Sequence, residues 1–174
     1  MRSRSNGKKD RKSIVLPAAI GILASIAAAF FFFYWSVHDQ EWSRRSMAAE
    51  AVTSATYMTV VERVETFVGD KTYSIVFGKD GEGKDAIAWF DPEEDTVHLE
   101  YVTNGITEDE ARQKVKSAHP ESEILRATPG VWDGVYLWEV FYRLDGEDGS
   151  HYYYDYYRFS DGEKIDTWRL VRIK

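Results

Sequence analysis

An uninterrupted apolar stretch near the N-terminus places the strongest constraint on this 174-residue chain. Residues 14–37 contain no Asp, Glu, Lys, Arg or His, and 12 of these 24 residues are Ile, Leu, Val or Phe. A helix rises about 1.5 Å per residue, so a segment of this length can cross a hydrocarbon core of roughly 30 Å. We therefore expect residues 14–37 to form a transmembrane helix.

The charges in front of this stretch predict its orientation. Residues 1–13 carry six Lys and Arg and one Asp, and basic flanks stay in the cytoplasm. We expect residues 1–13 to be a cytoplasmic tail and the C-terminal part to be extracellular, which makes the chain a single-pass protein of the cell membrane. A cleaved signal peptide is the alternative, because Ala27–Ala29 offers small residues at a possible cleavage site.

The remaining residues are strongly acidic and contain no cysteine. They carry 16 Lys and Arg against 28 Asp and Glu, a net charge of −12. Such a surface repels nucleic acid, so we expect no nucleic-acid partner, and any partner should present a basic or apolar face. The lack of cysteine excludes disulfides, thiol nucleophiles and cysteine-based metal sites.

Motifs for catalysis or metal binding are missing from the sequence. The four histidines lie far apart, and we interpret His98 and His119 as surface residues. The acidic runs 91–95 and 145–149 lack the order of an EF-hand loop, although weak cation binding by them stays open. No nucleophile motif is present. We therefore expect a chain that is not an enzyme, with no metal, no cofactor and no small-molecule substrate.

Periodicity predicts a helix that continues beyond the membrane to about Tyr57. No Gly or Pro occurs from Ile22 to Val68, and small apolar residues recur at helical spacing. These residues are Ala48, Ala51, Val52 and Ala55. Such a stripe indicates that this part of the helix packs on a sheet.

Strand-like runs follow this helix. They cover residues 60–68, 72–77, 86–90 and 96–102, with a turn at residues 78–84. Apolar and polar residues alternate in two of them, which predicts antiparallel strands with one buried and one solvated face.

A second helix and a second group of strands complete the chain. Thr107 and Glu110 have the spacing of a capping box, and His119–Pro120 ends the helix. The next strands are expected at residues 123–127, 135–143, 152–159 and 164–173, with a turn at Pro129–Gly130.

The two halves share the order of one helix followed by four strands, which suggests an internal repeat. Residues 72–77 can be aligned with residues 137–142, and residues 87–91 with residues 156–160. The expected fold class is α+β, with an N-terminal transmembrane helix and two small domains, each a helix packed on a short antiparallel sheet. A chance coincidence of amphipathic elements is the alternative.

A family resemblance rests on this order of elements and on a few residues. Residues 105–111, Gly-Ile-Thr-Glu-Asp-Glu-Ala, together with the strand that closes on residues 161–165, resemble a PepSY-type unit. The first half resembles a diverged copy, with Glu50–Val52 in its helix and Trp89–Asp91 in its third strand. With the basic tail and the single span, the chain is similar to the TseB-like (YpmB) proteins of Gram-positive bacteria.

This resemblance implies two cystatin-like, PepSY-like domains at residues 38–103 and 104–174. It also implies a noncatalytic regulator of cell wall elongation that binds a membrane-bound penicillin-binding transpeptidase. Two alternatives stay open: an inhibitor or chaperone of an extracytoplasmic protease, and an enzyme acting on wall polymer.

An aromatic run near the C-terminus is the candidate binding surface. Alternation places Tyr152, Tyr154 and Tyr156 on one face of a strand, and Trp132, Trp138 and Trp168 could extend that face. Tyrosine and tryptophan are enriched at protein interfaces, which favours a docking role. A central strand packed on both faces is the structural alternative.

Overall fold

The computed structural model describes the backbone of residues 12–171 and the side chains of residues 21–34 and 42–171. Most of the predicted basic tail, residues 1–11, lies outside this range, as do side chains at both ends of the predicted span. Within the described residues, no helix contains an apolar stretch long enough to cross a membrane. The chain divides into two units, Met1–Ser43 and Arg44–Lys174.

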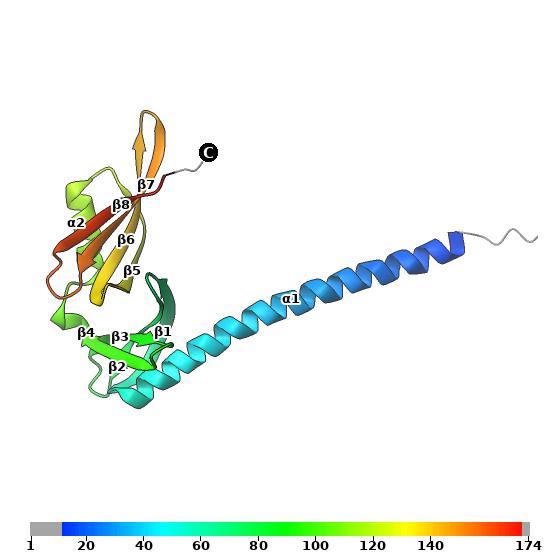
Figure 1. Cartoon of the computed structure of the whole chain (residues 1–174), viewed down its shortest axis with the longest axis horizontal. Helices are drawn as coiled ribbons and strands as arrows, with labels where there is room; N and C mark the ends of the chain where they lie inside the picture. The colour runs from blue at the N-terminus through cyan, green and yellow to red at the C-terminus, as the bar shows by residue number, and fades with distance from the viewer. Residues whose placement is uncertain (1–11, 172–174) are drawn as a thin grey trace, which may run out of the picture. The chain divides into compact units, whose positions relative to one another are not determined.

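The elements are those of an α+β fold with two four-stranded antiparallel sheets (Figure 1). In chain order they are α1 (Lys12–Ala55), β1 (Met58–Val68), β2 (Thr72–Asp80), β3 (Asp85–Asp91), β4 (Thr96–Tyr101), a 3₁₀ turn (Val102–Asn104), α2 (Glu108–Ala118), β5 (Glu123–Trp132), β6 (Val135–Gly146), β7 (Gly149–Arg158) and β8 (Lys164–Arg169). The first sheet has the strand order β1-β2-β3-β4 and the second β5-β6-β7-β8.

The last turns of α1 pack on the first sheet, as the small apolar stripe predicted. Ala48 and Val52 are fully buried there, and Ala51 packs beside them, whereas Ala55 is exposed. The helix ends at Ala55, and the N–H and the hydroxyl of Thr56, the next residue, both donate to the carbonyl of Val52, at 3.0 and 2.7 Å. Small side chains at these positions allow the helix to approach the strands closely.

The predicted capping box opens α2. The Glu110 N–H donates to Thr107 Oγ1 at 3.2 Å, and the Thr107 N–H donates to Glu110 Oε2 at 2.7 Å. Ala111 and Val115 are fully buried on the second sheet, and the N–H of His119 still donates to Val115. The helix therefore begins and ends where the sequence indicated.

Each predicted strand is present, but the predicted turn at Pro129–Gly130 is wrong. Both residues lie inside β5, where Pro129 pairs with Trp138, and the turn falls at Asp133–Gly134. Proline is tolerated because β5 is an edge strand, so its missing N–H costs little. Glycine is required because a Cβ at position 130 would collide with the ring of Phe67 in β1.

A single hydrophobic core joins the two sheets of the second unit. It combines Phe67 and Trp89 of the first sheet with Trp138 and Tyr157 of the second. Trp89 lies 5.0 Å from Tyr136 between ring centroids. A separate apolar cluster fills the other side of the first sheet, beneath α1. The expectation of one solvated face is therefore wrong for the central strands β2 and β3, because the second half of the chain covers that face.

The internal repeat is present in the order of its elements but not in the proposed residue alignments. Ser74 pairs with Phe90, but their aligned counterparts, Glu139 and Phe159, do not pair, since Glu139 pairs with Tyr156. The two proposed alignments therefore cannot both be in register, although both halves share the order of a helix and four strands. The division into domains at residues 38–103 and 104–174 stays a prediction.

A buried carboxylate cross-links the second sheet on the side of α2. Asp155 is fully buried and accepts hydrogen bonds from Lys164 at 2.8 Å, Thr167 at 2.7 Å, Tyr157 at 3.0 Å and Tyr142 at 3.3 Å. Burial, together with this carboxylate, raises the pKa of both tyrosines, so they stay protonated and donate. The network ties β8 to β6 and β7.

Aspartates also hold two hairpin turns. Asp80 Oδ1 accepts the N–H groups of Lys84 and Glu82 at 2.9 and 2.8 Å, and Asp161 Oδ1 accepts that of Glu163 at 2.9 Å. The backbone N–H of Lys84 lowers the pKa of Asp80, and that of Glu163 lowers the pKa of Asp161. These N–H groups favour the ionised carboxylates.

We expect Phe67→Ala to lower the free energy of unfolding by about 3–5 kcal/mol, because it opens a cavity in the core that joins the sheets. The measurement is urea unfolding of the full chain in detergent micelles, followed by circular dichroism. Val68→Ala is the matched control, since Val68 is 72% exposed. Equal losses in both variants would contradict the shared core.

Asp155→Ala should cost about 3 kcal/mol of stability, because the buried hydroxyls of Tyr142 and Tyr157 lose their acceptor and Lys164 loses its partner. The same unfolding measurement checks it. Glu147→Gln, in the exposed β6–β7 turn, should stay close to wild type. An unchanged midpoint for Asp155→Ala would show that the network contributes nothing.

Acid should unfold the chain partly through Asp80 and Asp161. Their folded pKa values are depressed, so their contribution is complete above the unfolded value of about 4 and is lost as the pH falls through the folded pKa. Unfolding midpoints measured between pH 6 and pH 2 should therefore fall less steeply for Asp80→Asn than for wild type. Parallel pH curves would rule out this contribution.

Candidate interaction surface

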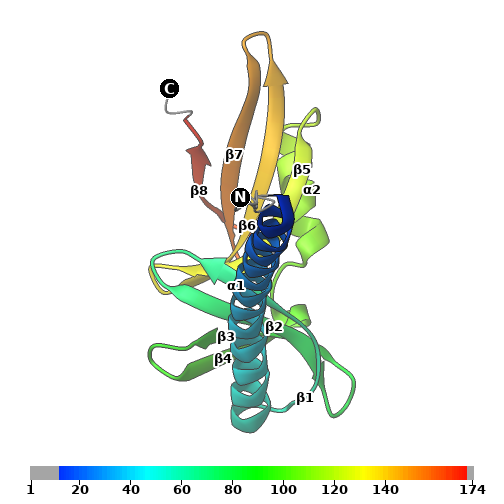
Figure 2. The same cartoon turned by 90° about the vertical axis from the view of Figure 1, so that its right-hand side faces the viewer.

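The second sheet has one face under α2 and one face built largely of aromatic rings. Figures 1 and 2 show α2 lying along β5 and β6. Tyr153 and Tyr157 of β7 point to the core on this side, as expected for a central strand. Their neighbours alternate to the opposite side. We call that side the aromatic face, and it comprises Trp132, Phe141, Tyr152, Tyr154, Tyr156 and Trp168.

Strand pairing brings these rings together from all four strands of the sheet. Trp132 of β5 lies 4.9 Å from Trp168 of β8 and 5.1 Å from Tyr156 of β7, in edge-to-face geometry. Phe141 of β6 stacks on Tyr154 at 4.6 Å. Contacts between aromatic rings in these arrangements add to the gain from burial. The rings form a continuous apolar surface on a rigid support.

The rings of the aromatic face differ in exposure, so some can contact a partner and others only support the surface from below. Trp168 is 49% exposed and Tyr152 is 37% exposed, whereas Tyr156 is only 6% exposed. Burial, and then the nearby carboxylate of Glu139, raises the pKa of Tyr156, so its hydroxyl stays protonated. Tyr156 therefore supports the surface, while Trp168 and Tyr152 are available to a partner.

Trp138 does not belong to the aromatic face. It is 2% exposed and lies in the core on the side of α2, where its Nε1 donates to the carbonyl of Ile106 at 2.8 Å. The structure thus brings together five of the six residues proposed from the sequence. Neighbouring positions along β6 point to opposite faces, so the strand register, which the sequence leaves open, decides between Trp138 and Phe141.

Sequence reasoning missed the polar residues beside this face. Asp166 lies next to Trp168, and its Oδ2 accepts the indole N–H at 2.8 Å. Asp70, from the turn between β1 and β2, lines the same hollow as Trp132 and Asp166. No local signal could have joined Asp70 to residues almost a hundred positions later.

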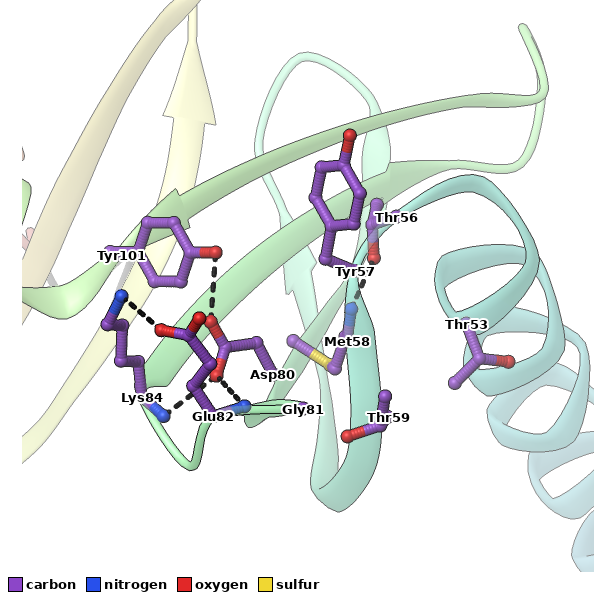
Figure 3. Close-up of a pocket in the computed structure, with 10 residues that line it drawn as sticks. All are labelled: Thr53, Thr56, Tyr57, Met58, Thr59, Asp80, Gly81, Glu82, Lys84 and Tyr101. Carbon is purple, nitrogen blue, oxygen red and sulfur yellow. Dashed lines mark hydrogen bonds and ion pairs between the residues drawn. The ribbon is translucent and has the colours of Figure 1, made fainter.

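A second hollow lies at the end of α1, but its polar groups serve the local fold. Figure 3 shows Asp80 bonded to the backbone of the β2–β3 turn and to Tyr101, whose hydroxyl donates at 3.0 Å. Thr56 Oγ1 accepts the N–H of Met58 at 3.2 Å. These bonds favour a structural role for Asp80.

The histidines are not all free surface residues. His98 stacks on Tyr136 with ring centroids 3.9 Å apart, and its Nε2 lies 3.1 Å from Glu100. His98 is therefore a partly exposed surface residue, with 36% of its side chain accessible, and the second half of the chain covers one side of its ring. Among the described residues, no group of three His, Asp or Glu is arranged to hold a metal ion.

Comparison with known proteins gives three concordant matches. The family model "Cell wall elongation regulator TseB-like domain" matches residues 47–91. The "Probable cell wall elongation regulator TseB" of Bacillus subtilis (strain 168) is 30% identical over 159 residues, which cover 88% of this chain and 94% of that protein. The solved structure of the YpmB protein from Bacillus subtilis aligns with a TM-score of 0.64 and 26% identity, over 72% of this chain and 96% of that one.

The match to the curated relative extends over nearly all of its length, and the solved structure has the same fold. The chain is a homologue of that elongation regulator and belongs to the TseB-like family.

Proposed function

We propose that this protein is a noncatalytic, membrane-anchored regulator of cell wall elongation, which binds a penicillin-binding transpeptidase outside the membrane. The observation that carries the proposal is the 30% identity to a protein named as an elongation regulator, over 94% of that protein. The transpeptidase as partner follows from the family resemblance.

The aromatic face supports a function that works by contact. Trp168 and Tyr152 offer large rings with few rotatable bonds, so little conformational entropy is lost when a partner covers them. The rings beneath them are packed against one another, which preorganises the surface.

The N-terminal sequence supports the membrane anchor. The apolar run at residues 14–37 has the length of a span, and the basic residues before it favour a cytoplasmic N-terminus. An anchor confines regulator and transpeptidase to one membrane and raises their effective concentration, so an interface of modest affinity is sufficient.

Crosslinking of the full-length protein in its membrane, followed by identification of captured proteins, tests this proposal. We expect wild type to capture a penicillin-binding transpeptidase, and the double variant Tyr152→Ala/Trp168→Ala to lose most of this product. Tyr57→Ala is the control, because Tyr57 is 82% exposed but lies between α1 and β1, beside the hollow at the end of α1 and not on the aromatic face.

The other outcomes decide between the alternatives. Reproducible capture of an extracytoplasmic protease without a transpeptidase would contradict the regulator and favour the inhibitor or chaperone. Release of fragments from purified wall polymer by the isolated protein would contradict the noncatalytic assignment. Equal loss of the product in Tyr152→Ala/Trp168→Ala and in Tyr57→Ala would show that the aromatic face has no special part in the contact.

A further inference from the structure

One end of the aromatic face opens into a hollow of about 360 Å³ that has an apolar wall and an acidic rim. Trp132, Val135 and Ile165 form the wall. We call the three acidic residues that line the hollow the rim; they are Asp70, Asp133 and Asp166, from the β1–β2 turn, the β5–β6 turn and β8.

These three carboxylates have no cationic partner among the described residues. Asp166 accepts the indole N–H of Trp168, and Asp70 accepts the backbone N–H of Lys71 at 3.0 Å. The ammonium group of Lys71 instead forms ion pairs with Asp91, at 3.2 Å, and with Glu94. Within the part of the chain that the structure describes, three carboxylates without an ion pair therefore line the same hollow as the indole of Trp132.

Carboxylates elsewhere on this sheet are paired. Glu139 binds Arg126 at 2.7 Å, and at the far end of the face Arg143 binds Glu123 at 2.7 Å. Among the described residues of the aromatic face itself, the carboxylates without an ion pair thus lie at the end that carries Trp132. That end has the electrostatic character to attract a cation.

We propose that this hollow receives a lysine or arginine side chain from a basic, partly apolar segment of the protein partner, whose apolar residues cover the aromatic face. The inference rests on the proposed function, since it describes the partner of the same surface. The aliphatic stem of the incoming side chain packs on Val135 and Ile165, while its charge meets the carboxylates and the ring of Trp132.

The shape of the hollow suits such a side chain better than a free ion. Among the described residues, its three carboxylates are not arranged to hold a metal ion, whereas its apolar wall can bury the methylene groups of lysine or arginine. The hollow is also continuous with the exposed ring of Trp168, because Asp166 and Trp168 are hydrogen-bonded to each other. A peptide segment can therefore occupy both at once.

Two charge variants test this proposal. Asp70→Asn/Asp133→Asn removes two rim charges, and the turn should tolerate it because asparagine readily adopts the positive φ of 50° seen at Asp133. Glu93→Gln/Asp95→Asn is the matched control. It removes the same charge from the β3–β4 turn, where Asp95 has a φ of 51°.

The probe is a short fluorescein-labelled peptide in which lysine alternates with leucine, titrated against the full chain in nonionic micelles. Fluorescence anisotropy should show binding to wild type, roughly 10-fold weaker binding to Asp70→Asn/Asp133→Asn, and binding within about 2-fold of wild type for the control. A counterpart peptide with glutamate for lysine should not bind. Equal weakening in both variants, equal binding of both peptides, or no binding would overturn the proposal.

The membrane crosslinking experiment separates this inference from the proposed function. If Asp70→Asn/Asp133→Asn captures the transpeptidase as well as wild type does, the proposed regulator function is supported. The proposed contact between a basic side chain and the hollow is then contradicted. A product made of two copies of this chain, lost in the same variant, would likewise overturn the assignment to a partner protein. Loss of transpeptidase capture in this variant, but not in Glu93→Gln/Asp95→Asn, supports both.

Discussion

The packing of the second half of the chain against the first sheet is the interaction on which the rest of the structure depends. That sheet buries apolar residues on both faces, one beneath α1 and one against the core that includes Phe67 and Trp89. Phe67 can lie over β5 because position 130 is glycine. Without this contact, each half would be a four-stranded sheet with a single helix and an uncovered apolar face, too small to be very stable alone.

The same contact assembles the candidate surface. The rings of the aromatic face come from β5 to β8, but Asp70 reaches the hollow beside them from the β1–β2 turn. The acidic rim is therefore complete only when the two halves are packed together. Because α2 occupies the other face of the second sheet, the aromatic face remains open, with a buried layer that includes Tyr156 beneath the exposed ring of Trp168.

Local signals predicted most of the elements, and contacts between the halves account for most of the failures. The capping box at Thr107 and the small residues of α1 give direct information about helix limits and packing. Pro129–Gly130 has the composition of a turn. The glycine is needed for another reason, because the ring of Phe67, some sixty residues earlier, lies against position 130. The stacking of Tyr136 on His98 and the place of Asp70 in the hollow also depend on contacts between the halves, which no local signal predicts. Trp138 was misplaced because strand register decides which face a residue takes.

The central claim is that the open face of the second sheet is where this protein meets its partner. Hydrogen–deuterium exchange of the full chain in membranes, with and without the captured transpeptidase, tests it most directly, because β8 and β4 are both edge strands. The account predicts slower exchange in β8 and in the β5–β6 turn when the partner is present, and unchanged exchange in β4. Protection confined to the first sheet, or no protection at all, would contradict it.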